Sequence, residues 1–450
     1  MNLTQRCTFL LIALAPVAVV AAPSEASGLM PCPAAVPAWV DHYATLAFRE
    51  SPYEDLVGTH RLPEAVARQR NHYRFAYDDA GRLIRVSFVL GDQVRALDHT
   101  ANVLMDTPDV EICYPDGMEV RHFRDAYGNP VYSRGNVAEE RYRLDERGYR
   151  QSLTFHDADG RGIENGWGIT RYRWERQRDG SVIETRVDAD GEPAEIRPGF
   201  PFYRVRLSFG AGGWLALMQN IDDAGRLVRN SLDAAEDQLE YAANGDMIAW
   251  NVFDEKQQRS EGNSPRVARG VREFTREGME RIERYEDRHG KAMRNAYGFR
   301  NTEATFDRFG NMLSRFSRDE ANAKTANPET GYAGYALRWD ASGRHRIGIR
   351  YIAANGEPAN HVRRGYHRIE EIHDAAGDRV EVRFLDEQGD LVNRLDNGVA
   401  REVHTYDNRH RRLSQAFFDR DGKPVVVNGS TERRWRYRAD GYPEPAGEAP

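Results

Sequence analysis

A glycine recurs along this chain at intervals close to 33 residues, and this period constrains the fold more than any other feature. The glycines are Gly81, Gly117, Gly148, Gly180, Gly213, Gly245, Gly278, Gly310, Gly343, Gly377 and Gly441, with His410 in the same place of one unit. Successive intervals range from 31 to 36 residues. We call these twelve positions the beat. A period of this size is typical of tandem units that stack because none can bury its own apolar face; it predicts about eleven units over residues 73–441.

Each unit contains a second turn, and the spacing between turns indicates strands. Asp-x-x-Gly occurs at the beat and again 10 to 13 residues later, as at 145–148 and 157–160. In such a turn the Asp side chain caps its own backbone, and glycine accepts the conformation that follows. The roughly eight residues between turns suit a strand. We therefore expect an all-β fold, an elongated antiparallel β-hairpin array forming a spiral or solenoid, with two or three strands per unit.

Aromatic residues form two columns in the repeat. The position four residues before the beat holds Tyr77, Phe209, Tyr241, Phe274, Phe306, Trp339, Tyr406 and Tyr437. We expect these eight rings to form a structural spine in the core, stacked between successive units. A second column, five residues before the second turn, holds Phe123, Phe155, Tyr285, Tyr351, Phe384 and Phe417. Such columns also bind sugars or peptides in some proteins, but their place beside every turn favours the structural interpretation.

The two ends of the chain differ from the repeats. Residues 1–21 have the pattern of an export signal, because Arg6 precedes a short apolar run that ends in small residues. A retained membrane anchor is the alternative. Residues 22–72 are expected to form a cap with helical character at 37–48 and 63–69, and the Pro- and Gly-containing tail 442–450 to be disordered. We expect a periplasmic or extracellular protein with no membrane span after signal cleavage.

Two cysteines remain after the signal, Cys32 and Cys113. In an oxidising compartment such a pair predicts one disulfide, which would tether the cap to the edge of the array. Two separate buried thiols are the alternative. Charged residues make up 30 % of the chain and the net charge is −7, so no overall positive field attracts nucleic acid.

Residues 74–83, Arg-Phe-Ala-Tyr77-Asp78-Asp-Ala-Gly81-Arg-Leu, resemble the tyrosine-aspartate (YD) repeat of Rhs-type secreted proteins. Residues 403–413 and 370–377 are looser copies. The units here are longer than typical YD units, and we expect no toxin domain after them. What the resemblance implies is a spiral sheet and an extracellular or envelope setting.

Few residues point to a chemistry. No nucleophile, nucleotide or zinc-protease motif is present. Paired carboxylates in the turns at 157–160, 188–191 and 419–422 suggest calcium, but the wider ligand set is missing, so ordinary turns are favoured and no metal or cofactor is expected. Five histidines gather in the C-terminal units, where structural substitution is favoured over a zinc or catalytic cluster: His361, His367, His373, His404 and His410. Residues 320–330 are interpreted as an insertion in place of a second turn, on a possible binding face.

The sequence therefore favours an exported, non-enzymatic binding or scaffold protein that presents a repetitive β surface to a protein, a peptide or an envelope glycan. Two alternatives stay open. One is an accessory or remnant of an Rhs-like toxin-delivery system. The other is an enzyme that acts on envelope polysaccharide or peptide, which would require two converging carboxylates with perturbed pKa values.

Overall fold

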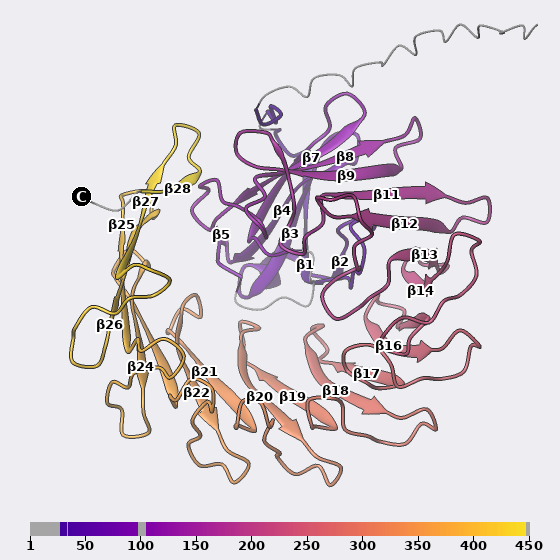
Figure 1. Ribbon diagram of the computed structural model, residues 1–450. Helices are drawn as coiled ribbons and strands as arrows, with labels where there is room; N and C mark the ends of the chain where they lie inside the picture. Colours follow the sequence, from indigo (N-terminus) through magenta and orange to yellow (C-terminus); the bar gives the residue numbers. More distant parts are fainter. Residues whose placement is uncertain (1–27, 34, 98–104, 447–450) are drawn as a thin grey trace, which may run out of the picture.

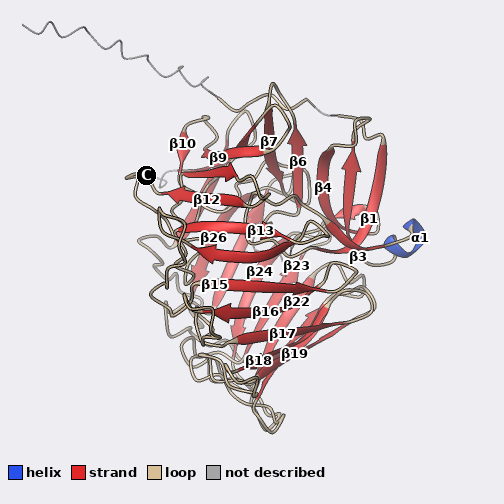
Figure 2. Cartoon of the chain, turned by 90° about the vertical axis from the view of Figure 1, so that its right-hand side faces the viewer, coloured by secondary structure: helices blue, strands red, loops and turns tan. Residues whose placement is uncertain are grey.

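The computed structural model describes residues 28–33, 35–97 and 105–446. These residues form one antiparallel sheet of 28 strands and a single short helix, α1 (Glu64–Ala67), which lies at the periphery (Figure 2). The strands are β1 (Trp39–Leu46), β2 (Gly58–Arg61), β3 (Asn71–Tyr77), β4 (Leu83–Leu90), β5 (Gln93–Val94), β6 (Asp109–Cys113), β7 (Met118–Arg124), β8 (Glu139–Leu144), β9 (Arg150–His156), β10 (Gly162–Ile163), β11 (Arg171–Arg176), β12 (Val182–Val187), β13 (Arg204–Phe209), β14 (Leu215–Asn220), β15 (Glu236–Tyr241), β16 (Met247–Phe253), β17 (Arg269–Phe274), β18 (Glu280–Glu286), β19 (Asn301–Phe306), β20 (Met312–Arg318), β21 (Gly334–Trp339), β22 (Arg346–Ile352), β23 (Arg368–His373), β24 (Arg379–Leu385), β25 (Arg401–Tyr406), β26 (Arg412–Phe418), β27 (Glu432–Tyr437) and β28 (Pro443–Pro445). The expected all-β hairpin array is confirmed. In the described part of the chain, no helix is long and apolar enough to cross a membrane.

Every beat position lies in the turn of a hairpin, from β3–β4 around Gly81 to β27–β28 around Gly441. In the first hairpin, Asp78 Oδ1 accepts the backbone N–H groups of Ala80 and Arg82, and Gly81 has a φ of 81°. Left-handed backbone of this kind costs glycine little, whereas His410 adopts it at φ 63° with a side chain attached. The Asp carboxylate and the left-handed glycine of this motif therefore close the hairpin turn.

Each unit contributes two long strands and a lateral loop. Hairpin β25–β26 is joined by six residue pairs, whereas only three pairs join β24 to β25. The loop between β26 and β27 contains the second turn, an isolated bridge between Phe418 and Pro424, and a third turn. Two strands per unit is thus the observed number for these hairpins.

The sheet curls into a spiral (Figure 1). Its strands follow the order β2, β1, β3, β4, β6 and then chain order to β28, while β5 pairs with β4 and β10 with β9. The strands β1–β5 lie near the centre, and the later hairpins pass around them until β27 and β28 come back beside β7–β9. The beat turns of the later hairpins therefore meet the N-terminal strands.

We call this line of contact the seam. Its contacts run in chain order on both sides: His60 with Asp246, Asn71 with Asn311, Leu90 with Arg344, Tyr127 with His410, and Ala138 with Tyr442. The partners are 186 to 304 residues apart. The array is thus held by contacts between windings as well as by stacking of neighbouring units.

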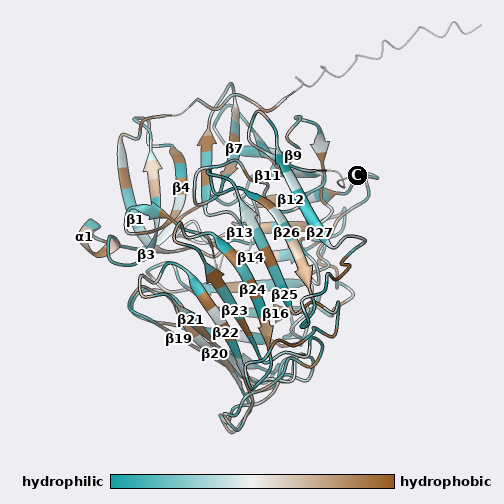
Figure 3. Ribbon diagram, turned by 90° about the vertical axis from the view of Figure 1, so that its left-hand side faces the viewer, coloured by the Kyte–Doolittle hydropathy of each residue, from teal (hydrophilic) through white to brown (hydrophobic). Residues whose placement is uncertain are grey.

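The buried core consists of the second aromatic column and a column that the sequence analysis missed. Phe123, Phe155, Tyr285, Tyr351, Phe384 and Phe417 are all buried, with exposed fractions of 3 to 7 %. The residue that follows the third turn is equally buried, as in Val137, Ile169, Phe202, Val267, Tyr366 and Val399. Apolar and polar residues alternate along many strands (Figure 3), as in a sheet with two different faces.

The eight rings of the predicted spine are all half-buried, less deeply than expected of core residues. Tyr77 and Phe209 pack against the buried core. Several still link units, because Trp339, Tyr406 and Tyr437 donate hydrogen bonds to backbone carbonyls of the preceding hairpin at Met312, Arg379 and Arg412. Each of these rings is the last residue of a strand, directly before the beat turn.

The N-terminal segment is more β-rich than expected. Residues 39–46, predicted to be helical, form β1, which pairs with β2 and β3. Pairing on both sides and burial of Ala44 and Leu46 outweigh the helical propensity of this stretch. Helix α1 lies within the other predicted helical stretch, 63–69.

The expected disorder of the tail is corrected for residues 442–446. Pro443–Pro445 form β28 beside β27, and Tyr442 is 4 % exposed because its hydroxyl donates to Ala138 O across the seam. The remaining tail residues, 447–450, and the predicted signal, 1–21, lie outside the described residues.

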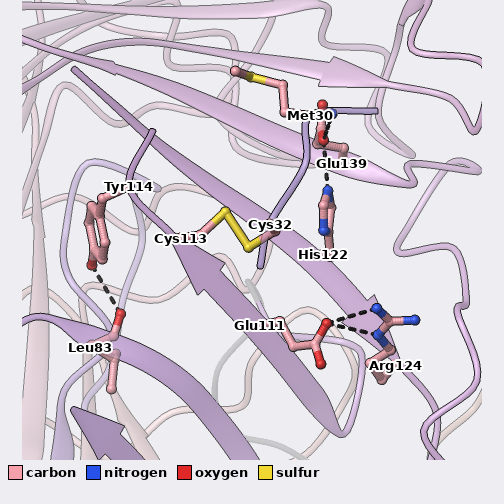
Figure 4. Close-up of a disulfide and its surroundings, with 9 residues drawn as sticks. All are labelled: Met30, Cys32, Leu83, Glu111, Cys113, Tyr114, His122, Arg124 and Glu139. Atoms are coloured by element: carbon pink, nitrogen blue, oxygen red, sulfur yellow. Dashed lines mark hydrogen bonds and ion pairs between the residues drawn. A yellow bond between two sulfur atoms is a disulfide. The ribbon is translucent and has the colours of Figure 1, made fainter. Parts of the chain in front are cut away.

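Cys32 and Cys113 form the predicted disulfide (Figure 4), with their Cα atoms 5.6 Å apart. Cys113 ends β6, which lies inside the sheet between β4 and β7, so the bridge does not attach to an edge. The same segment is fixed by the Met30 backbone N–H, which donates to Glu139 Oε2 at 2.8 Å. The disulfide thus joins the segment that precedes β1 to the end of β6, inside the sheet.

Residues 320–330 are not an insertion. Asp319 and Asn322 form the second turn of their unit, since the Asn322 N–H donates to Asp319 O at 3.0 Å and Asn322 takes the glycine conformation at φ 65°. The motif was missed because asparagine, the residue that best tolerates this backbone after glycine, replaces it.

Candidate functional site

A groove of about 920 Å³ lies along the seam, between β5 with the turn after β7 on one side and the beat turns of β21–β26 on the other. A second hollow of about 290 Å³ adjoins it and extends to β27 and β28. Asp125, Tyr406 and His410 line both hollows. We call the two together the seam groove. Residues from both windings build it.

Aromatic and imidazole rings line the groove. Tyr127, from the first winding, stacks on His410 with ring centroids 3.9 Å apart. The rings of His345 and His373 lie 4.8 Å apart. Burial lowers the pKa of His373, and the neighbouring His345 lowers it further. The floor of the groove therefore offers flat ring surfaces.

Two carboxylates fix the imidazoles. His345 Nδ1 lies 2.9 Å from Asp340 Oδ2, and His410 Nδ1 lies 3.1 Å from Asp378 Oδ2. These contacts use one ring nitrogen of each histidine and leave Nε2 for other partners. The side-chain oxygens of the two acids are thus engaged locally.

Arginines outnumber the carboxylates that pair with them. Glu371 binds both Arg346 and Arg379, each with a contact of 2.8 Å. Burial opposes ionisation of Glu371, but the hydrogen bond and charge of Arg346 outweigh it, so its pKa is lowered. Arg344 and Arg412 form no ion pair with any described residue.

Arg344 and Arg412 are held in other ways. Arg344 donates to Leu90 O at 2.9 Å, and Arg412 lies over the ring of Trp435 at 4.3 Å. Burial lowers the pKa of both side chains. Asp125 also lines the groove, and its Oδ1 caps the backbone of its own turn. The lining of the groove thus holds six arginines and three acidic residues between aromatic and imidazole rings.

The predicted histidine cluster divides in the structure. Only His373 and His410 reach the groove, whereas His361 packs against Tyr351 and Tyr366. His367 and His404 are buried. Sequence reasoning missed His345, which follows a beat glycine by two residues, and Tyr127, which comes from a distant unit. Five spine rings line hollows: Tyr406 and Tyr437 line the groove, and Phe274, Phe306 and Trp339 line a separate cavity.

The paired turn aspartates do not converge on a common point. Asp157 Oδ1 accepts the N–H groups of Asp159 and Arg161, and Asp188 and Asp419 cap their own turns in the same way. Asp159 forms an ion pair with Arg438 across the seam. Within the described ranges, no group of three or more His, Cys, Asp or Glu side chains is placed to hold a metal.

No family model and no curated protein matches this chain. Among solved structures, it is similar to TcdB2-TccC3-Cdc42 at 12 % identity and a TM-score of 0.29, over 83 % of this chain and 21 % of that one. TcdB2-TccC3 without its hypervariable C-terminal region matches at 12 % identity and a TM-score of 0.28, over 84 % and 23 %. A porin-like protein from Bacteroides uniformis matches at 10 % identity and a TM-score of 0.14, over 84 % and 87 %.

These similarities do not assign the chain to a family. The chain spans about a fifth of the length of the TcdB2-TccC3 chains that it matches. At such identities and TM-scores, the comparisons add no residue role. The site is therefore argued from its own geometry.

Two acids with opposite pKa shifts lie outside the groove. Arg272 contacts Glu280 at 3.3 Å and Glu283 at 3.1 Å, and Arg315 approaches both acids. Burial raises the pKa of Glu280, whereas in Glu283 the charge of Arg272 outweighs burial and lowers it. Glu280 faces a cavity of about 140 Å³, which is too small to admit a polymer. The two arginines account for the pair as a structural ion cluster.

Proposed function

We propose that this protein is an exported, non-enzymatic binding protein whose seam groove holds an anionic segment of a cell-envelope polymer. The supporting observation is the excess of guanidinium groups over partner carboxylates in a groove that also presents Tyr127, Tyr406 and Trp435. Guanidinium groups suit carboxylates and phosphates, and ring faces suit sugars or other flat groups. The repetitive β scaffold serves to bring the two windings together.

Export is proposed from the pattern of residues 1–21 and the disulfide, which suits an oxidising compartment. A relationship to YD-type units is proposed from the Tyr77-Asp78 turn, in which the Asp caps the hairpin and the Tyr occupies the last strand position. We favour binding over catalysis because the groove's three acids are already engaged: Glu371 by Arg346, Asp378 by His410, and Asp125 by the backbone of its own turn.

The binding proposal is tested by calorimetry with a short oligogalacturonate, a polyphosphate of matched length and a neutral dextran oligomer. We expect the two anions to bind and their affinity to fall as salt rises, because the attraction is between exposed charges. Arg412→Gln should weaken binding roughly two- to fivefold, the range of a single exposed ion pair. Preference for the polyphosphate or the oligogalacturonate would identify the anionic group.

A matched control is Arg350→Gln, which removes an exposed arginine of β22 that does not line the groove. Its binding should equal that of the wild type. Equal losses in Arg412→Gln and Arg350→Gln, or binding of the neutral dextran as tightly as the anions, would contradict the proposal.

A further inference from the structure

A separate cavity, outside the seam groove, lies between the N-terminal strands and the concave side of the later hairpins. It is bordered by β1, β3 and β4 on one side and by β16–β21 on the other, and its volume is about 140 Å³. Six rings line it: Phe48, Tyr73, Phe88, Phe274, Phe306 and Trp339. We call it the inner cavity. Because three of these rings belong to the repeat's own spine, the cavity is a product of the spiral and not of a single loop.

The polar groups that line the inner cavity already have partners. Arg95 donates to Asn71 Oδ1, Asn311 Oδ1 and Gly343 O at 2.8 to 3.0 Å. Arg315 donates to Thr302 Oγ1 at 2.9 Å and also approaches Glu280. A charged ligand would have to break these contacts.

We propose that the inner cavity binds a small, neutral, apolar molecule about the size of one aromatic ring. The volume supports this size, since an engineered apolar cavity of about 150 Å³ stays dry and binds benzene. Ring faces and edges in the wall favour an aromatic guest over a linear one. Met247, Met279 and Met312 also line the cavity, and their flexible side chains can adjust to substituents.

The first experiment measures fluorobenzene and benzoate binding to the full chain by ligand-observed fluorine and proton NMR. Fluorobenzene should bind in the roughly micromolar to millimolar range open to so small a ligand. It should also raise the thermal unfolding midpoint, because it binds only the folded state. Benzoate should bind at least about tenfold more weakly. Absence of fluorobenzene binding, or equal binding of benzoate, would overturn the proposal.

The second experiment fills the cavity. Ala44→Leu adds bulk from β1, where Ala44 is buried and lines the cavity, and should abolish fluorobenzene binding without lowering the thermal midpoint. Ala249→Leu, at a buried alanine outside the cavity, should keep binding but lower the midpoint, because no space receives the added atoms.

A second pair of variants covers failure of the first to fold. Leu337 lines the cavity two residues before Trp339, and Leu239 occupies the same place before Tyr241 without lining it. Leu337→Phe should weaken fluorobenzene binding, and Leu239→Phe should leave it unchanged. Unaltered binding in Leu337→Phe and Ala44→Leu would place the guest elsewhere and refute the assignment.

Discussion

His42 of β1 and His72 of β3 form a hydrogen-bonded pair that should make the protein less stable in acid. His72 of β3 is 1 % exposed, and its Nδ1 lies 3.1 Å from Arg70 O. A carbonyl can only accept, so Nδ1 carries the proton and Nε2 accepts from His42 Nδ1–H, 3.0 Å away. A second proton on His72 would set two N–H groups against each other. Burial is the main cause that lowers the pKa of His72 to about 4, and the charge of His42 contributes.

The sign of the effect follows from proton binding in the two states. Above pH ~7.5 both states hold His72 neutral, so it adds no pH dependence. As pH falls below about 6.5, the unfolded chain takes up a proton that the folded protein refuses until pH ~4. A difference of about 2.5 pKa units corresponds to about 3.4 kcal/mol, or about 2–3 kcal/mol after allowance for partial solvent screening. Stability is therefore lost between these two pH values and not regained below them.

The assay compares urea unfolding of the wild type and His72→Gln at several pH values from 7.5 to 4, followed by circular dichroism. The variant loses hydrogen bonds, so it should be less stable at pH 7.5, but the gap should shrink by about 2–3 kcal/mol on acidification. His289→Gln, at an exposed turn, should leave a constant gap. A gap between wild type and His72→Gln that does not change with pH would refute the reasoning.

Three further outcomes are expected. Replacing Cys32 and Cys113 together by Ser should lower the free energy of unfolding by about 4–5 kcal/mol on the chain-entropy model for a separation of 81 residues, as measured by urea titration, and no loss would contradict the bridge's role. Phe417→Ala should cost about 3–5 kcal/mol and Tyr406→Ala clearly less, because only Phe417 is fully buried; the reverse order in the same titration would contradict the core assignment. Tyr442→Ala should speed hydrogen exchange in β27 and β28 while β15–β20 stay protected, and uniform protection would show that the seam is not held there.

Much of the fold was predictable because its signals are local. The Asp-x-x-Gly turns fixed the hairpins, and their spacing fixed the strand length. The half-burial of the spine was not predictable, because Phe417 and Tyr406 have similar neighbours in sequence and differ only in which part of the curled sheet they occupy. Likewise, residues 39–46 have helical propensity but form β1, because they pair with β2 and β3. A local propensity does not register such pairing.

The candidate site was far less predictable. His373 and His410 stood out as departures from the repeat, but nothing in the sequence places Tyr127 beside His410, 283 positions later. Arg344 and Arg412 look like any other arginine of the chain. Whether either arginine is free to bind a ligand depends on which carboxylates lie close enough to pair with it. That is decided by which units the spiral brings together.

The seam gives the number of units a meaning that ordinary solenoids lack. In a linear array, duplication or loss of one module lengthens or shortens the rod and leaves the other interfaces intact. Here each later hairpin faces one particular N-terminal partner, so an extra module would move every subsequent partner out of alignment by one step. Gain or loss of one module should therefore disturb every seam contact beyond it, so the order of the twelve hairpins in the described residues matters as well as their packing.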